Sequence, residues 1–283
     1  MGHAAIPFTA GIDPPRLTLP AGATDCHHHV YDPVAPVAPG GRPHEAASLS
    51  DHARLMARLG SARHVLVQPS TYGFDNALHL GALREAGPAR ARMVAVVPPD
   101  APLAGLRAMA AQGVAGARAN LVQGIPLGPA DVAPLARRIA GLGWHLQLFA
   151  GADMIAALGP VLRDAPCPVV FDHFAQLPLR GWAAHPAWAV VMDLVQAGRG
   201  WVKLSSPYSL DQGEPLRVRD LARALVAAAP ERLVWGTNWP HPNAERLPDD
   251  AALLDALAEW APAGATRRAI LADNPARLYG FTP

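Results

Sequence analysis

The sequence predicts an α/β fold, a (β/α)₈ TIM barrel, on two observations. Apolar, strand-like runs alternate with Ala- and Leu-rich helical stretches from about residue 24 to the end of the chain. Eight such pairs is the number that closes a parallel barrel. The length of 283 residues also suits one barrel, which takes ~250 residues. We therefore expect a single barrel domain over residues 1–283, with residues 1–23 as an N-terminal extension.

Each expected strand is a short apolar run, and each expected helix a longer stretch of good helix formers. The strands are expected at Thr24–Val30, His64–Gln68, Met93–Val97, Gly116–Asn120, His145–Phe149, Val169–Asp172, Val202–Ser205 and Leu233–Gly236. The helices are expected at Leu49–Leu59, Ala77–Ala86, Leu103–Gln112, Val132–Leu142, Met154–Leu158, Trp188–Ala197, Pro215–Ala229 and Ala251–Trp260. A doubly wound open sheet also alternates strands and helices, but it usually has fewer units, and no Gly-rich phosphate turn follows the first strand. The segment Tyr31–Leu49, rich in Pro, Gly and Ala, is expected to lie over the mouth of the barrel.

Composition excludes several classes of partner. Lys plus Arg number 24 and Asp plus Glu number 23, so the charge shows no bias toward nucleic acid or an anionic membrane. No apolar run reaches the ~20 residues of a membrane span. Cys26 and Cys167 are too few for a disulfide scaffold, and the N-terminus lacks a signal-peptide pattern. We expect a cytoplasmic protein that binds a small molecule, whose oligomeric state the pattern leaves open.

Polar residues gather at the ends of the predicted strands, where barrel enzymes carry their catalytic groups. The candidates are His27 and His29 on the first strand, Ser70 and Tyr72 after the second, Arg118 and Asn120 on the fourth, Gln147 on the fifth, His173 after the sixth, Tyr208 after the seventh, and Asn238 and His241 after the eighth.

The spacing of the first-strand histidines is informative. Side chains alternate along a strand, so Asp25, His27 and His29 should face one way and His28 the other. Two imidazoles on one inward face can converge on one metal ion or on one carbonyl oxygen. His173 would join them, because the barrel brings its strand end close.

Two cations are expected to point inward. Arg118 and Lys203 are costly to bury without a partner. Each either pairs with a core carboxylate or awaits an anionic group of the substrate, which a guanidinium holds in a bidentate fork.

The motifs in their order resemble the amidohydrolase superfamily, specifically the branch that contains 2-pyrone-4,6-dicarboxylate lactonase. The resemblance runs from about Asp25 to Phe281 and is carried by DCHHHVYDP, QPSTYGFDN, GVAGARANL, VVFDHF, WVKLSSPYSL, LVWGTNWPHP and ADNPARLYGF. It implies a (β/α)₈ barrel in which water attacks a lactone, ester or amide, with a strand-eight carboxylate as the base. It also implies that this branch can work without a metal, whereas metal-dependent relatives hold a divalent ion on the same histidines.

The sequence departs from that family pattern at three places. Asn238 stands where the family usually has Asp, and a carboxamide cannot take a proton at neutral pH. Gln147 occupies the strand-five position where metal-binding relatives often have His, while His145 lies one step deeper. The segment after the seventh strand, with Tyr208, carries no arginine, which favours a monoanionic or neutral lactone over a dicarboxylate.

The leading interpretation is a lactonase or carboxylic-ester hydrolase that needs no cofactor. His27, His29 and His173 would polarise the carbonyl, with Asn238 beside the attacking water and a histidine such as His173 or His241 taking its proton. The expected substrate contacts are Arg118, Ser70, Tyr72, Asn120, Gln147, Tyr208 and His241. One alternative is a metal-dependent hydrolase or decarboxylase whose Zn²⁺ or Mn²⁺ is bound by the three histidines. Another is a binder or inactivated enzyme, because Asn238 replaces the base.

Overall fold

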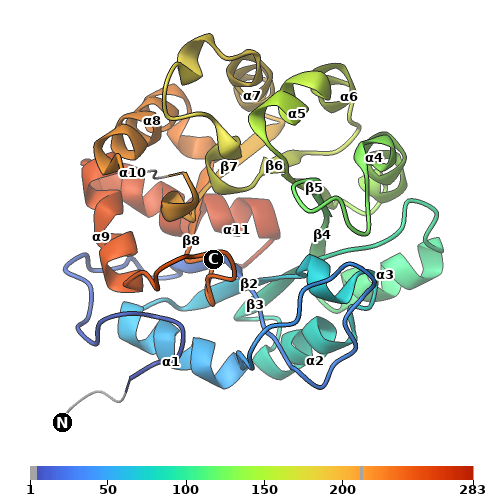
Figure 1. The fold of residues 1–283 in the computed structure, drawn as a ribbon, viewed down its shortest axis with the longest axis horizontal. Coiled ribbons are helices and arrows are strands. Elements are labelled where there is room, and N and C mark those ends of the chain that lie inside the picture. Colours follow the sequence, from blue (N-terminus) through green and yellow to red (C-terminus); the bar gives the residue numbers. More distant parts are fainter. Residues whose placement is uncertain (1–4, 211–212, 283) are drawn as a thin grey trace.

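A computed structural model describes residues 5–210 and 213–282 and contains the predicted barrel (Figure 1). Its strands are β1 (Thr24–His28), β2 (Arg63–Val67), β3 (Ala91–Ala95), β4 (Val114–Asn120), β5 (His145–Phe149), β6 (Val169–Phe171), β7 (Gly200–Ser205) and β8 (Leu233–Gly236). They pair in parallel in chain order from β1 to β8. The order of a doubly wound sheet, which reverses direction at a switch point, is therefore excluded.

The barrel closes where the carboxyl end of β1 meets the chain after β8. The backbone N–H of Asn238 donates to the carbonyl of His27 (2.8 Å), and that of His29 donates to the carbonyl of Trp239 (2.9 Å). Asp25 reinforces this seam, since it accepts from the backbone N–H and the hydroxyl of Thr237 at 2.9 and 2.7 Å. A Cβ on Gly236 would lie 2.7 Å from the His27 nitrogen, so this closure requires glycine.

Helices surround the strands (Figure 1). They are α1 (Leu49–Leu59), α2 (Ala77–Ala86), α3 (Leu103–Ala111), α4 (Val132–Ala140), α5 (Ala152–Ala157), α6 (Gly159–Arg163), α7 (Pro186–Gln196), α8 (Pro215–Ala228), α9 (Asp250–Trp260), α10 (Gly264–Arg268) and α11 (Asn274–Tyr279). Local chemistry sets their ends: Ser48 and Asp51 form a capping box at the start of α1, and Gly60 ends it with φ 78°. The sequence analysis missed α6, α10 and α11, which are short.

The N-terminal extension packs on the barrel where the chain closes. The indole Nε1 of Trp239 donates to the carbonyl of Pro7 (2.9 Å), and the Phe8 ring meets the Trp239 ring edge-on. Farther along, Arg16 pairs with Asp255 on α9 (3.0 Å). Within the described residues, no helix combines the length and apolar character that crossing a membrane requires.

Candidate active site

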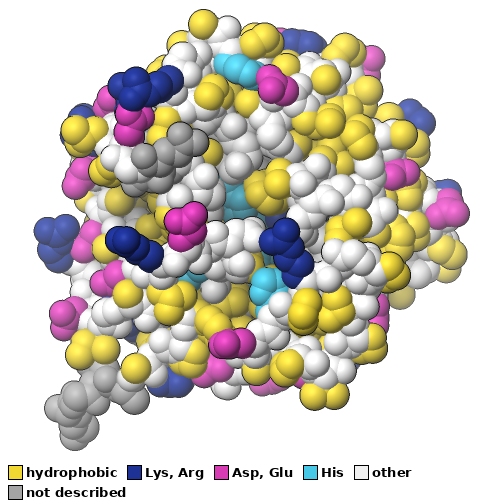
Figure 2. Space-filling model, in the orientation of Figure 1, with side chains coloured by type: hydrophobic (Ala, Val, Ile, Leu, Met, Phe, Trp, Pro, Cys, Tyr) yellow, Lys and Arg dark blue, Asp and Glu magenta, His cyan; other side chains and the backbone are white. Residues whose placement is uncertain are grey.

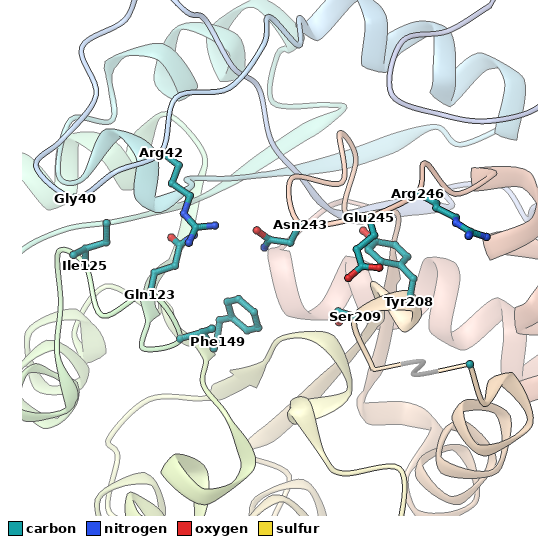
Figure 3. Close-up of a pocket in the computed structure, with 12 residues that line it drawn as sticks. Gly40, Arg42, Gln123, Ile125, Phe149, Tyr208, Ser209, Asn243, Glu245 and Arg246 are labelled. Atoms are coloured by element: carbon teal, nitrogen blue, oxygen red, sulfur yellow. The ribbon is translucent and has the colours of Figure 1, made fainter.

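The polar strand ends open into two connected pockets on one face of the barrel. The inner pocket is lined by His29, Arg118, His173 and Asn238 among others. The outer pocket, of about 880 Å³, shares Gln123, Phe149, Ser209 and Asn243 with it. Figure 2 shows histidine side chains at the bottom of a hollow near the centre of this face. In Figure 3, Arg42, Gln123 and Phe149 lie on one side of the outer pocket and Tyr208 and Glu245 on the other.

His27 and His29 converge as their spacing predicts, with ring centroids 5.0 Å apart. The Nδ1 of His29 lies 2.7 Å from the carbonyl of Val67, so this nitrogen carries the hydrogen and Nε2 presents a lone pair. Asp25 does not join them, contrary to the simple alternation. The register shifts between Asp25 and His28, and the Asp25 carboxylate instead meets His52 of α1 at 3.0 Å.

Asp172, which the sequence analysis did not assign to the site, is its electrostatic centre. Its carboxylate is fully buried and lies 3.0 Å from Arg118 Nε, 3.3 Å from His27 Nδ1 and 3.6 Å from Lys203 Nζ. Gln147 also donates to it (3.1 Å). The two inward cations therefore pair with a core carboxylate, one of the two alternatives that the sequence left open. The only available signal was that Asp172 immediately precedes His173 at the end of β6.

Burial and these charges set the protonation states around Asp172. The pKa of the Asp172 carboxyl is held well below its usual range by His27, Lys203 and Arg118, despite its burial. Burial lowers the pKa of His27 to about 4 and that of Lys203 to about 8. At neutral pH the cluster therefore holds one anion and two cations around a neutral imidazole, and its net positive charge favours an anion in the pocket above.

Lys203 and Gln147 form the floor beneath the pocket. Lys203 donates to the carbonyl of Cys26 (3.0 Å) and to Gln147 Oε1 (2.7 Å), and neither side chain is exposed. Gln147 thus orders the charged cluster and does not line either pocket. His145 lies deeper, as predicted: a Cβ on Gly116 would contact its ring, and that ring meets Tyr279.

An unusual turn presents His173. Residues His173, Phe174, Ala175 and Gln176 (η3) all have positive φ, between 48° and 58°, where a non-glycine residue is strained by ~1–2 kcal/mol. The turn brings the His173 ring to 4.8 Å from that of His27. His173 Nδ1 lies 2.8 Å from the Ser205 hydroxyl, and burial lowers the pKa of His173 well below its usual range.

Asn238 belongs to a chain of side-chain hydrogen bonds that leads away from the pocket. Its Nδ2 donates to the Tyr208 hydroxyl (2.8 Å), which lies 2.9 Å from His241 Nδ1. His241 Nε2 in turn lies 3.2 Å from the buried carboxylate of Asp250. Asp250 is a second acidic residue that the sequence analysis missed, because nothing in its local pattern at the start of α9 distinguishes it from a surface residue.

The remaining candidates divide into two groups. Ser70 and Asn120 line the inner pocket and hydrogen-bond each other (2.9 Å). Tyr72 lines neither pocket, and its hydroxyl bonds the backbone of Asp32. The Tyr31–Leu49 segment lies over the mouth as predicted, since Tyr31 and His44 line the inner pocket and Arg42 the outer one.

Two groups of buried side chains place possible metal ligands close together. In one, His27, Asp172 and His173 offer ligand atoms within 4.8 Å of one another. Asp172 therefore takes the place of His29 in the predicted set of three histidines. The other comprises His28, His52 and His64 on the far side of β1. Its His28 and His52 rings stack in parallel 3.5 Å apart, so their in-plane lone pairs cannot both point at one ion.

The sequence matches the profile of the amidohydrolase family over residues 24–281. The chain belongs to the amidohydrolase family. Similar curated proteins include the 2-pyrone-4,6-dicarboxylate hydrolase of Comamonas testosteroni, 34% identical over 94% of this chain and 92% of the relative. The 4-sulfomuconolactone hydrolase of Hydrogenophaga intermedia is 32% identical (95% and 92%). The D-galactarolactone isomerase of Agrobacterium fabrum is 30% identical (95% and 94%).

Solved structures agree with this assignment. An apo protein of Agrobacterium tumefaciens superposes with a TM-score of 0.88 at 27% identity, covering 98% of this amidohydrolase and 99% of that chain. A probable 2-pyrone-4,6-dicarboxylic acid hydrolase of Acinetobacter baumannii, solved with citric acid bound, has a TM-score of 0.82 at 25% identity (92% and 100%). The fold and the family predicted from the sequence are confirmed.

Proposed function

We propose that this amidohydrolase opens small anionic lactones by attack of water, without a metal ion. One observation carries the proposal: the inner pocket is lined by imidazole, guanidinium, amide and hydroxyl groups, and no carboxylate is among its described lining residues. Such a surface accepts a carboxylated, oxygen-rich molecule and stabilises negative charge that develops on a carbonyl oxygen. The lactone-active relatives support the same class of substrate.

His173 is placed to polarise the lactone carbonyl. If the Ser205 hydroxyl donates to His173 Nδ1, the neutral ring carries its hydrogen on Nε2 and donates it to the carbonyl oxygen. Arg118 uses its Nε for Asp172, its Nη1 donates to the carbonyl of Gln68 at 3.5 Å, and the residue also lines the pocket. In this proposal Nη2 donates to the substrate carboxylate. His29, with its lone pair on Nε2, accepts a hydrogen from water or from a substrate hydroxyl.

The charges around Asp172 argue against a divalent ion. His27, Asp172 and His173 would be the ligands of such an ion, which would act as a Lewis acid on the carbonyl. The charge of Asp172 is already compensated by Arg118 and Lys203. Asn238 is neutral, whereas the family is expected to have a negatively charged Asp at this position. A 2+ ion here would face two buried cations with one shared carboxylate, so the donor set fits an ion poorly.

Turnover of matched lactones tests the proposal. The purified protein, treated with a chelator, should open lactones that carry a carboxylate with a lower KM than neutral lactones of the same ring size. His173→Ala should lower kcat by about 100-fold, because one donor to the oxyanion is lost. Arg118→Lys should raise KM for the anionic series only. Full activity of His173→Ala, or activity that appears only with added Zn²⁺ or Mn²⁺, would contradict this mechanism.

Isomerisation of a lactone is a second candidate, and Asn238 favours it. Because no carboxylate is among the described residues that line the inner pocket, a hydroxyl of the substrate itself can attack the carbonyl more readily than water, since it is already held close. One relative is named an isomerase. The ester would then move from one substrate oxygen to another with no net hydrolysis.

A further inference from the structure

We propose that Tyr208, His241 and Asp250 form a proton relay that takes the place of the missing strand-eight carboxylate, with Tyr208 receiving the proton of the attacking water. The inference rests on the proposed lactone chemistry and deepens it, because it identifies the group that accepts the proton. It follows from the directions of three consecutive hydrogen bonds.

The directions are fixed from the buried end of the chain. The Asp250 carboxylate can only accept, so His241 Nε2 carries the hydrogen of their 3.2 Å contact. In the proposed relay the His241 ring carries only this hydrogen at rest, so its Nδ1 has a lone pair and the Tyr208 hydroxyl donates to it across 2.9 Å. Asn238 Nδ2 donates to the same hydroxyl oxygen (2.8 Å). With one hydrogen on the His241 ring, these three bonds have one consistent arrangement of hydrogens.

This arrangement decides what Asn238 presents to the substrate. Because its Nδ2 is held by Tyr208, its Oδ1 is the atom left to accept a hydrogen from a water in the inner pocket, which Asn238 lines. The Tyr208 hydroxyl also has a side-chain hydrogen bond with Ser206, which lines the inner pocket. In the proposed step the water takes the place of Ser206 at the second lone pair of the Tyr208 oxygen. A water held by Asn238 can therefore deliver its proton to the neighbouring Tyr208 oxygen.

The reaction then balances without an external base. As the water oxygen bonds to the lactone carbonyl carbon, its proton passes to Tyr208 while the Tyr208 proton passes to His241 Nδ1, and Asp250 stabilises the resulting imidazolium. When the tetrahedral intermediate breaks its ring C–O bond, the proton returns by the same route to the leaving alkoxide. Burial raises the pKa of Tyr208, so the two protons move together and a free phenolate does not form.

Two further features are costly for the fold and are explained by such a role. Asp250 is completely buried, and one of its oxygens has no partner among the described residues, which is expensive for a carboxylate with no structural need. Asn238 and His241 both adopt positive φ, 65° and 59°. Strained non-glycine residues of this kind concentrate at functional sites.

A double-mutant experiment tests the relay. Tyr208→Phe should lower kcat on the best anionic lactone by about 100-fold with little change in KM, the size of one general-base contribution. In the Asn238→Asp background the same change should cost less than about 5-fold, because the new carboxylate takes the proton directly. His241→Gln and Asp250→Asn, which leave the phenol in place, should lower kcat in the native background in the same way.

The controls separate the relay from folding and from the proposed function. Tyr279→Phe removes a buried hydroxyl that has no partner among the described residues and should leave kcat unchanged. All variants should keep the native far-ultraviolet circular dichroism and should unfold cooperatively. Equal losses in both backgrounds, or near-native kcat for Tyr208→Phe, would overturn the relay while lactone turnover stands. No lactone turnover in any background, Asn238→Asp included, would instead overturn the proposed function and the relay with it.

Discussion

At the scale of single residues, the site depends on a carboxylate that contacts no solvent. Asp172 compensates two buried cations, Arg118 and Lys203, and orients His27. Removing one member of such a group costs more than the group contributes to stability, because the charges left behind remain buried. Asp172 is therefore needed both for folding and for the electrostatics of the pocket.

Asp172→Asn should lower the free energy of unfolding by about 3–5 kcal/mol, the range for breaking a buried ion pair. Urea denaturation measures it. Asp193→Asn is the matched control, because Asp193 makes a solvent-exposed pair with Arg163 at 2.8 Å and should cost less than about 1 kcal/mol. Similar losses in the free energy of unfolding for the two substitutions would show that the ion pairs of Asp172 stabilise the fold no more than an exposed pair does.

The sequence predicted a site residue correctly where its position at a strand end brings it to the pocket. The prediction failed where the contacts of the side chain determine its role. His29, His173, Arg118 and Asn238 reach one pocket because each stands at a strand end. Asp172 and Asp250 were missed as site residues, because a carboxylate is identified as buried only by the side chains around it. Tyr72 has the right position in the chain, but its hydroxyl is taken by the backbone of Asp32.

At the scale of elements, the turn after β6 shows how the backbone serves the site. Four consecutive residues with positive φ place His173 against His27. The sequence HFAQ contains no glycine, so it does not predict a left-handed turn. The strands were predictable because buried parallel strands are continuous apolar runs. The observed strand ends differ from the predicted ones by up to two residues, and β1 ends at His28.

Ala175→Gly and Ala189→Gly make the same chemical change in opposite backbone conformations. Ala175 has φ 57°, so glycine relieves strain that offsets the lost methyl burial, and the free energy of unfolding should stay within about 0.5 kcal/mol of native. Ala189 is exposed within α7, where glycine should cost about 1 kcal/mol. Equal losses at both positions, measured by urea denaturation, would argue against the left-handed turn.

At the scale of the whole molecule, the barrel buries histidines well beyond the site. Burial lowers the pKa of His64, His79 and His145 to about 3 in each case, against about 6.5 in an unfolded chain. The folded state thus binds fewer protons than the unfolded state between these values. Stability therefore rises with pH in that window and is lost as the pH falls below about 6.5.

Acidification should accordingly destabilise the protein before any carboxylate titrates. Between pH 7.5 and pH 5.5 these three histidines should remove roughly 4 kcal/mol from the free energy of unfolding, about 1.4 kcal/mol each. The other buried histidines act in the same direction. His145→Leu, which removes one of these three buried rings, should reduce the pH dependence. An unfolding free energy that is constant over this range would contradict the neutral state of these rings.

The fold as a whole was predictable from the alternation of strands and helices alone, because eight units leave few other parallel arrangements. For the site at the mouth of the barrel, the sequence predicted which residue types are present but not how their side chains hydrogen-bond. The hydrogen-bond chain from Asn238 to Asp250 joins residues from the ends of β7 and β8 and from α9, and only the folded arrangement places them in line.

Proton release during turnover tests the central claim, that this amidohydrolase hydrolyses anionic lactones, most directly. Hydrolysis of a lactone near pH 8 yields a carboxylate and releases about one proton for each molecule opened, because a carboxylic acid is fully ionised there. A weakly buffered assay that follows lactone and protons together, on chelator-treated protein, should give this ratio. Consumption of the lactone with no proton release would show isomerisation, and no consumption across the anionic series would contradict the account.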